Sequence, residues 1–426
     1  MIKKRTDQVF GMSNAVLQDS YVDRGELDSA LGRLLGRRVH VAIRGPSKSG
    51  KSWLRQRAIS NSITVQCRLG YSVANVYESA LSELGIRLVI EELTKSTFKG
   101  HVEGSLSAGS DLIGKVAAKI DAEAGREASS TTQQVGKDIN DLKFIAQLIS
   151  ESGRRLVIED VHYLSAEQRQ ILAYDMKALW DYGCFVIVVG VWGEANMFVH
   201  LNSDLSGRIQ EIPLEWGPDD LRKIIENGSN ALKVQFSREI QNKVTMDCFG
   251  NAGLLQRLVL QALDEAKIEF EQEAVVNIVD MKIYESAAMA VADQLNGVYQ
   301  KFAERVASGI RTRNDSTGIY AHAMAAIVDA EDVKHMHGIS VDEIFAVTHR
   351  RQSRIQKGNL KSILAKIDGL QVDDDGRGLV VTYDSDDEKV LNVDRQLLFY
   401  RKYITLTWPW EQLIAEAESA ANDSTG

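Results

Sequence analysis

The stretch VHVAIRGPSKSGKSWL, residues 39–54, decides the fold that we predict for this chain. Apolar residues alternate over residues 39–43, as they do in a strand, and residues 51–57 are typical of a helix. Glycines between the two let the backbone curl so that N–H groups point inward, and the start of the helix favours an anion there. The pattern G-x-x-x-x-G-K-[ST] is satisfied by Gly45, Gly50, Lys51 and Ser52. The stretch therefore predicts a phosphate-binding loop, or P-loop.

Two side chains of this loop have the chemistry needed to act on a nucleoside triphosphate. Lys51 would neutralise the β- and γ-phosphates, and Ser52 would be a ligand of Mg²⁺. We therefore predict ATP and Mg²⁺ as cofactors. The residues expected to contact the nucleotide are Gly45, Pro46, Ser47, Lys48, Ser49, Gly50, Lys51, Ser52 and Trp53.

Composition limits the class of protein. The chain has 426 residues, of which 44% are hydrophobic and 26% charged, which is typical of a soluble protein of two or three domains. Its formal charge of −9 argues against wholesale attraction to nucleic acid, so any such contact needs a local basic patch. The three cysteines have no metal-binding spacing, and no apolar run approaches the length of a membrane span. We expect a cytoplasmic protein with no membrane contact.

Strands and helices alternate around the loop in the order typical of a parallel sheet that is covered on both faces. We predict an α/β fold with a five-stranded parallel P-loop NTPase sheet, an α-helical lid and a C-terminal winged-helix domain. The expected division is a core at 1–216, a lid at 217–283, a connecting helix at 284–312, a winged helix at 313–405 and a tail at 406–426. Predicted strands lie at 39–43, 62–69, within 154–164, at 184–191 and at 209–214, and predicted helices at 27–35, 51–57, 73–84, 138–149 and 165–180.

The segment 98–136 interrupts this order, because it is rich in Gly, Ala and Ser. Residues 101–108 and 116–123 alternate between apolar and polar positions, which predicts a β-hairpin. The weak side chains favour a disordered linker instead. Both interpretations stay open at this stage.

Two adjacent acids follow the apolar strand within residues 154–164. Carboxylates at the carboxyl end of such a strand can hold Mg²⁺ and orient the attacking water. By position, Glu159 is the metal-side acid and Asp160 the base, so both are candidate metal and catalytic residues. The side chain of Asp160 is shorter than that of a glutamate base, and we therefore expect slow hydrolysis.

The last third of the chain predicts three helices at 319–330, 340–348 and 357–367, and two strands at 379–383 and 390–393. This order is typical of a winged helix. A local basic cluster around the third helix favours DNA contact, whereas acids at 373–375 and 384–388 favour a protein partner. The basic cluster consists of His349, Arg350, Arg351, Arg354, Lys357, Lys361 and Lys366.

The P-loop at Gly45–Ser52 and the acidic strand at Ile158–Asp160 resemble those of AAA+ ATPases of the initiator (origin-recognition-like) clade and of their STAND relatives. The resemblance covers most of residues 21–403. It implies ATP hydrolysis, assembly into a homo-oligomer through the nucleotide, and action on a partner. The P-loop and acidic phrases also look like prokaryotic ATPases of mobile elements or antiphage defence.

The resemblance also implies roles for single residues. Tyr21, Val22 and Arg24 match the segment that packs near the nucleotide base. Arg208, before the fifth strand, matches an arginine finger, which reaches the γ-phosphate of a neighbouring subunit. Arg257 matches a second sensor in the lid. The first sensor has only weak candidates, Glu194 and Asn196.

These observations leave two functional interpretations. One is an ATP-binding and hydrolysing switch or motor that oligomerises through the nucleotide and acts on a partner protein or DNA, with antiphage defence as one setting. The alternative is a DNA-binding ATPase of the initiator or transposition type that uses its winged helix.

Overall fold

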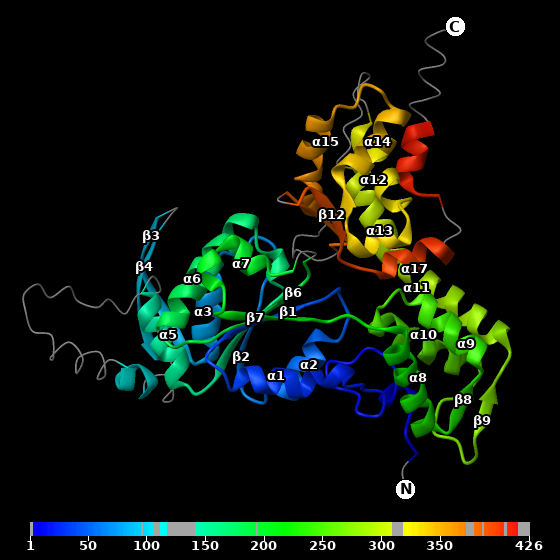
Figure 1. Ribbon diagram of the computed structural model, residues 1–426, viewed down its shortest axis with the longest axis horizontal. Coiled ribbons are helices and arrows are strands. Elements are labelled where there is room, and N and C mark those ends of the chain that lie inside the picture. Colours follow the sequence, from blue (N-terminus) through cyan, green and yellow to red (C-terminus); the bar gives the residue numbers. More distant parts are fainter. Residues whose placement is uncertain are drawn as a thin grey trace, which may run out of the picture. The chain divides into compact units, whose positions relative to one another are not determined.

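A computed structural model describes residues 3–94, 97–104, 111–116, 141–192, 195–308, 318–371, 379–385, 387–403 and 407–415 (Figure 1). The chain forms two compact units. The sheet unit comprises Gly25–Gly45 and Leu54–Leu214, and the lid unit comprises Met1–Arg24, Pro46–Trp53 and Glu215–Gly426. The P-loop residues after Gly45 thus belong to the lid unit.

The sheet unit is built on a parallel sheet of five strands in the spatial order β2-β5-β6-β1-β7. The central strand β1 pairs with β6 on one side and β7 on the other, so that Val41 lies opposite both Ile187 and Gln210. All five predicted strands are confirmed. Their bounds are β1 His40–Arg44, β2 Ser62–Gln66, β5 Arg155–Glu159, β6 Ile187–Gly190 and β7 Ile209–Pro213.

Helices cover both faces of this sheet. Successive side chains of a strand point to opposite faces, and apolar side chains lie on both. Val41 and Ile43 pack with Leu31 and Leu54 on one face. Ala42 belongs to the core on the other face, together with buried residues of α3, α5 and α6, which lie side by side in Figure 1. The helices are α1 Leu27–Leu35, α2 Lys51–Ala58, α3 Val73–Glu83, α5 Leu142–Glu151, α6 Ala166–Asp181 and α7 Met197–Leu201.

The hairpin predicted at 101–108 and 116–123 was wrong in its pairing. The antiparallel partner of β4 (Thr97–Gly104) is the preceding segment β3 (Ile86–Thr94), and residues 111–116 are helical. The sequence IRLVIEELT is rich in β-branched and apolar residues, whereas residues 116–123 are rich in alanine, which favours helix. Residues 117–140, which include most of the second predicted strand, lie outside the described residues.

The segment following the sheet unit was predicted to be helical, and it contains α8 (Pro218–Leu232), α9 (Arg238–Asp247) and α10 (Ala252–Glu265). Sequence reasoning missed a short parallel pair, β8 (Val234–Phe236) and β9 (Val276–Ile278). Lys233 ends α8 in the left-handed region at φ +55°, which turns the chain into β8. Gly228 is required in α8, because a Cβ there would lie 2.3 Å from the ring of Phe10.

The long helix α11 (Met281–Ser308) leads to the winged-helix segment, which we define as α12 to α17. Its three predicted helices and two predicted strands are confirmed, and a short strand, β10, completes an antiparallel sheet in the order β10-β12-β11. The bounds are α12 Ile319–Val328, α13 Asp332–His337, β10 Ile339–Ser340, α14 Val341–Arg351, α15 Lys357–Leu364, α16 Ile367–Gln371, β11 Val381–Asp384, β12 Lys389–Asn392 and α17 Gln396–Tyr403. Within the described ranges, we find no helix whose length and apolar character would let it cross a membrane.

Candidate functional site

The P-loop has the backbone of a tight turn before a helix. Lys48 and Gly50 both lie in the left-handed region, at φ +59° and +89°. Ser49 between them is fully buried, and its hydroxyl has no hydrogen-bond partner among the described residues. A buried hydroxyl without a partner costs free energy. The turn therefore holds an unsatisfied polar group that a bound ligand could satisfy.

The P-loop lysine folds back onto its own loop. Lys51 Nζ donates a hydrogen bond to the carbonyl oxygen of Pro46 at 2.6 Å, and the side chain is buried. Ser52, the next residue, is exposed. A phosphate oxygen is a stronger acceptor for an ammonium group than a neutral carbonyl is. The loop thus fits the phosphates of a nucleotide, with Lys51 already beside it.

Arg24 and Trp216 brace the P-loop from one side. Arg24 Nη1 and Trp216 Nε1 donate hydrogen bonds to the carbonyl of Ser49 at 3.3 and 2.8 Å. Of the three residues predicted near the nucleotide base, Arg24 makes this contact, Val22 is buried in the core of the lid unit, and Tyr21 is half-buried. Sequence reasoning missed Trp216, whose position shortly after the last strand of the sheet was the available signal.

Trp53 was also predicted to contact the nucleotide. Its indole N–H instead donates a hydrogen bond to the carbonyl of Ser13 at 3.0 Å. The first residue of the P-loop is attached to the sheet, because the backbone N–H of Gly45 donates to the carbonyl of Gly190 in β6 at 3.2 Å.

The start of α10 also contacts the P-loop. Asn251 Nδ2 donates to the carbonyl of Ser47 at 3.3 Å, and the backbone N–H of Gly253 donates to the carbonyl of Lys48 at 3.1 Å. A Cβ on Gly253 would lie 2.9 Å from Lys48 Cβ, so only glycine allows this approach. The predicted sensor Arg257 instead donates to Gln294 of α11 at 2.6 Å.

The winged-helix segment reaches the same loop. The backbone N–H of Ser47 donates to the carbonyl of Val393 at 3.2 Å, directly after β12. Lys48 Nζ forms an ion pair of 3.6 Å with Asp394. One loop N–H and one loop cation, the kinds of group that bind phosphate, are thus held by the winged-helix segment.

The two predicted acids follow each other at the carboxyl end of β5, and each has a partner within the sheet unit. Glu159 accepts a hydrogen bond from Arg55 Nε at 2.9 Å. Asp160 lies at φ +59° and accepts from Gln66 Nε2 at 3.0 Å. Arg55 belongs to α2, one helical turn after Ser52, and this spacing was the signal that sequence reasoning did not use. A cation bound at Glu159 would compete with this guanidinium.

A third carboxylate lies at the carboxyl edge of the sheet and was not predicted. Glu211 of β7 accepts hydrogen bonds from Arg44 Nε at 2.9 Å, from Trp192 Nε1 at 3.1 Å and from the backbone N–H of Asn196 at 3.1 Å. It ties together the ends of β1, β6 and the following turn. The sensor candidate Asn196 joins this network through its backbone, and Glu194 lies outside the described residues.

Arg208 lies at the opposite edge of the sheet from the end of β1 that leads into the P-loop. Its carbonyl accepts from the N–H of His40, the first residue of β1, at 2.8 Å. Its guanidinium lies 4.8 Å over the ring of Trp180 and donates to the carbonyl of Asp204.

The donor set suits Mg²⁺ that is held partly by a nucleotide. Over the described ranges, no three or more His, Cys, Asp or Glu side chains form a group that could hold a metal ion. Mg²⁺ characteristically uses one or two protein carboxylates, substrate phosphates and water. Glu159, at the end of β5, is a carboxylate of this type.

The central strand β1 leads into the phosphate-binding loop, β5 carries the acids, and β6 lies between them. The fold is that of a P-loop NTPase. No family model and no curated protein matches the chain by sequence. Solved structures with a similar fold include the ORC1 protein of Aeropyrum pernix in complex with DNA, at 12% identity and a TM-score of 0.41, over 94% of this chain and 96% of that one.

Two further solved structures are similar at comparable values. The ORC2 protein of Aeropyrum pernix, solved as ADPNP–ADP complexes, has 11% identity and a TM-score of 0.35 over 95% of this chain and 94% of its own. A STAND protein with a tetratricopeptide repeat sensor from Pyrococcus horikoshii has 12% identity and a TM-score of 0.37 over 96% of this chain. This chain spans 45% of that protein. At such values no function is transferred, and the site residues alone support a proposal.

Proposed function

We propose that this chain is an ATP-dependent switch that binds and slowly hydrolyses ATP and acts on a protein partner. The hydrogen bond from Ser47 N–H to the Val393 carbonyl supports this proposal most directly. Phosphates entering the loop would compete for that N–H and for Lys48, so nucleotide binding would loosen the winged-helix segment. The state of the nucleotide is thereby linked to a surface that can bind a partner.

Each site residue has a role in this proposal. Bound ATP would supply the phosphoanhydride bond that is cleaved. Lys51 would leave the Pro46 carbonyl to neutralise the phosphates, Ser52 and Glu159 would hold Mg²⁺, and Asp160 would orient and deprotonate the attacking water. Because Asp160 is held by Gln66 and Glu159 by Arg55, both acids must exchange partners first, which favours slow turnover.

Assembly would complete the site. Arg208 lies at the edge of the sheet away from its own P-loop, so we propose that it acts as an arginine finger on a neighbouring copy. Hydrolysis would then require a homo-oligomer, and an arginine supplied in this way typically accelerates phosphoryl transfer strongly.

The charges of the winged-helix segment favour a protein partner over DNA. Two lysines of the basic cluster on α15 are already paired: Lys357 with Asp342 and Lys361 with Glu388. A lysine that must leave a carboxylate to reach a phosphate gains less from DNA. The motifs resemble those of ATPases of antiphage defence. In such a role, the partner would be an effector protein.

Turnover and assembly measurements test the enzymatic part. Lys51→Ala should abolish ATP hydrolysis. Asp160→Asn and Arg208→Ala should each bind ATP but not hydrolyse it, and mixing these two variants should restore part of the activity. Mass measured with and without ATP should show a larger species with ATP. Full activity in Arg208→Ala, or a monomer that hydrolyses ATP, would contradict the arginine finger.

Binding to DNA is tested separately. We expect little binding of double-stranded DNA at physiological salt, with little change upon Lys357→Glu plus Lys361→Glu. Tight binding that weakens steeply with salt and is lost in this double variant would favour the initiator-type alternative instead.

A further inference from the structure

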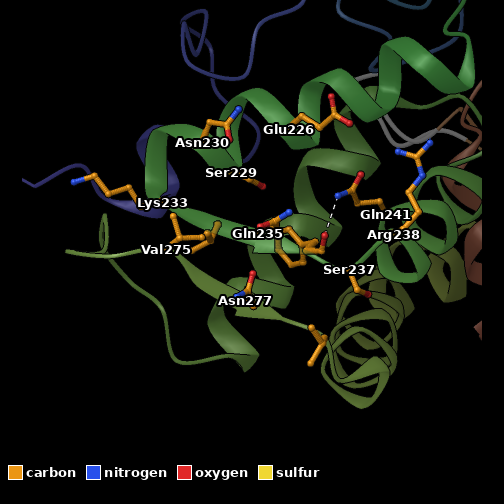
Figure 2. A pocket seen from close by; sticks show the side chains of 13 residues that line it. Glu226, Ser229, Asn230, Lys233, Gln235, Ser237, Arg238, Gln241, Val275 and Asn277 are labelled. Atoms are coloured by element: carbon orange, nitrogen blue, oxygen red, sulfur yellow. Dashed lines mark hydrogen bonds between the residues drawn. The ribbon is translucent and has the colours of Figure 1, made fainter.

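A cavity of about 680 Å³ lies in the lid unit, and none of the residues that line it belongs to the P-loop (Figure 2). The end of α8, the short β8–β9 sheet and the start of α9 form its walls. This volume is typical of ligand sites in proteins. None of the roles proposed above uses it.

The sheet presents two amides to this cavity. Gln235 of β8 and Asn277 of β9 lie directly opposite each other in the parallel register, so both side chains leave the same face of the sheet. Their strand neighbours Val234, Phe236 and Ile278 are buried in the core, on the other face. Both amides line the cavity and are exposed, so a ligand can reach them.

Two buried polar atoms in the walls also lack partners. Ser229 of α8 is 5% exposed, and its hydroxyl has no hydrogen bond with the described residues. Gln241 of α9 donates through Nε2 to the Phe236 carbonyl at 2.9 Å (dashed in Figure 2), but its Oε1 is buried and unpaired. Buried polar groups nearly always have a partner, and leaving one without costs about 1–3 kcal/mol. A ligand with both donors and acceptors would relieve this cost.

The charge of the lining gives little net attraction for a strongly charged ligand. Lys233 is paired with Glu271 at 2.9 Å, and the remaining charged groups, Glu226 and Arg238, have opposite signs. The lining is thus nearly neutral, unlike a phosphate or nucleic-acid site.

The apolar part of the lining selects among neutral ligands. Val275 and Val279, at the two ends of β9, are 61% and 68% exposed and line the cavity. The one aromatic residue of the lining, Phe236, is buried in the core, so no exposed ring is offered for stacking a base or a sugar. Paired amides with aliphatic neighbours instead suit a peptide backbone with small apolar side chains.

We propose that this cavity binds an extended, uncharged peptide segment of a protein partner. The amides of Gln235 and Asn277 pair with the N–H and C=O groups of the segment, Ser229 and Gln241 satisfy further groups, and the valines contact its apolar side chains. The proposal deepens the proposed function, since it gives the protein partner a docking site that is separate from the nucleotide.

A random heptapeptide library displayed on phage and selected against the full chain tests this proposal. Selected peptides are then synthesised, and their affinity is measured by fluorescence anisotropy. We expect uncharged peptides whose binding changes little with salt. Gln235→Ala plus Asn277→Ala should weaken them about tenfold, the loss of one to two hydrogen bonds. Asn227→Ala, an exposed amide of α8 outside the lining, is the matched control and should bind as the unmodified chain does.

Several outcomes would overturn the peptide site. These are a selection that yields no peptide, peptides that bind the double variant equally well, binding that salt abolishes, or a malto-oligosaccharide that binds where peptides do not. Thermal unfolding checks that the double variant folds. ATP affinity of the double variant separates this site from the proposed function, because it should equal that of the unmodified chain whether or not the peptide site exists.

Discussion

The guanidinium of Arg24 lies 3.7 Å from the centre of the Trp216 ring, and both side chains donate a hydrogen bond to the same acceptor, the carbonyl of Ser49. Both are largely withdrawn from solvent, which strengthens a cation–π contact. The pair holds the carbonyl of Ser49 pointing toward Arg24 and Trp216. Because the N–H of Gly50 belongs to the same planar peptide group, its orientation is fixed as well. Residues before and after the sheet unit in sequence thereby shape the phosphate-binding turn.

Trp216→Phe should weaken ATP binding about fivefold, because it removes one hydrogen bond of about 1 kcal/mol and keeps the ring under Arg24. Trp216→Ala should weaken it further. Titration with a fluorescent ATP analogue measures both. Trp180→Phe is the matched control, since that indole N–H donates to the carbonyl of Arg38 in the sheet unit. Unchanged affinity in Trp216→Ala would show that the brace does not shape the loop.

Asp394→Asn should increase the affinity for ATP about threefold, because it releases Lys48 from an ion pair that competes with phosphate. The amide oxygen can still accept from the backbone N–H of Gln396, and the amide nitrogen then faces the hydroxyl of Tyr299, which can accept, so the segment should keep its fold. Calorimetric titration with ATP measures the change. Asp332→Asn, which removes an ion pair with Arg401 elsewhere in the winged-helix segment, should leave the affinity unchanged. Weaker ATP binding in Asp394→Asn would contradict the competition.

Sequence reasoning predicted the features that depend on local pattern. The strand before Gly45, the helix from Lys51 and the acids at the end of β5 are each determined by local sequence, so periodicity and motif spacing were sufficient. The pairing of β3 with β4 was missed because strand partners depend on register and tertiary packing, which alternation alone does not encode.

The contacts that hold the P-loop in place could not be predicted from local pattern. Trp216, Asn251 and Val393 reach residues 47–49 from positions more than 150 residues away in sequence. Nothing in their local sequence indicates that approach. Gly253 gave the best available indication of a close contact, because a glycine inside a helix often has a packing reason.

Asp247 should prove one of the most costly carboxylates to remove. It is fully buried and receives hydrogen bonds from Tyr284, Tyr403 and Lys402, with Lys243 also paired at 3.1 Å. Burial alone would raise the pKa of Asp247, but these donors hold it below its usual range. The network joins α9, α11 and α17.

Asp247→Asn should lower the free energy of unfolding by about 3 kcal/mol, because two ammonium groups lose their counter-charge and an amide N–H₂ faces other donors. Urea unfolding at neutral pH measures this. Asp181→Asn, which breaks the exposed pair with Lys177, is the control and should cost less than about 0.5 kcal/mol. Equal effects of the two substitutions would contradict the proposed importance of the buried network.

His40 gives the sheet unit a pH dependence with a definite sign. The ring is fully buried, the N–H of Val186 donates to Nδ1 at 3.0 Å, and Nε2 lies 2.8 Å from the carbonyl of Met176. With Nδ1 accepting, the neutral ring carries its proton on Nε2 and donates to Met176. Burial, opposed in part by the Met176 contact, lowers the pKa of His40 from 6.5 to about 4. Protonation of Nδ1 would also break the hydrogen bond from Val186.

Because the unfolded chain binds a proton at a higher pH than the folded chain does, this histidine should reduce stability as the pH falls from about 6.5 toward 4. At about pH 5 the loss attributable to His40 should be about 2 kcal/mol. Urea unfolding of the unmodified chain and of His40→Gln at several pH values measures it, and the variant should have a smaller slope whatever its own stability. His337→Gln, at an exposed site, should keep the original slope. A slope in His40→Gln equal to that of the unmodified chain would show that another group causes the acid sensitivity.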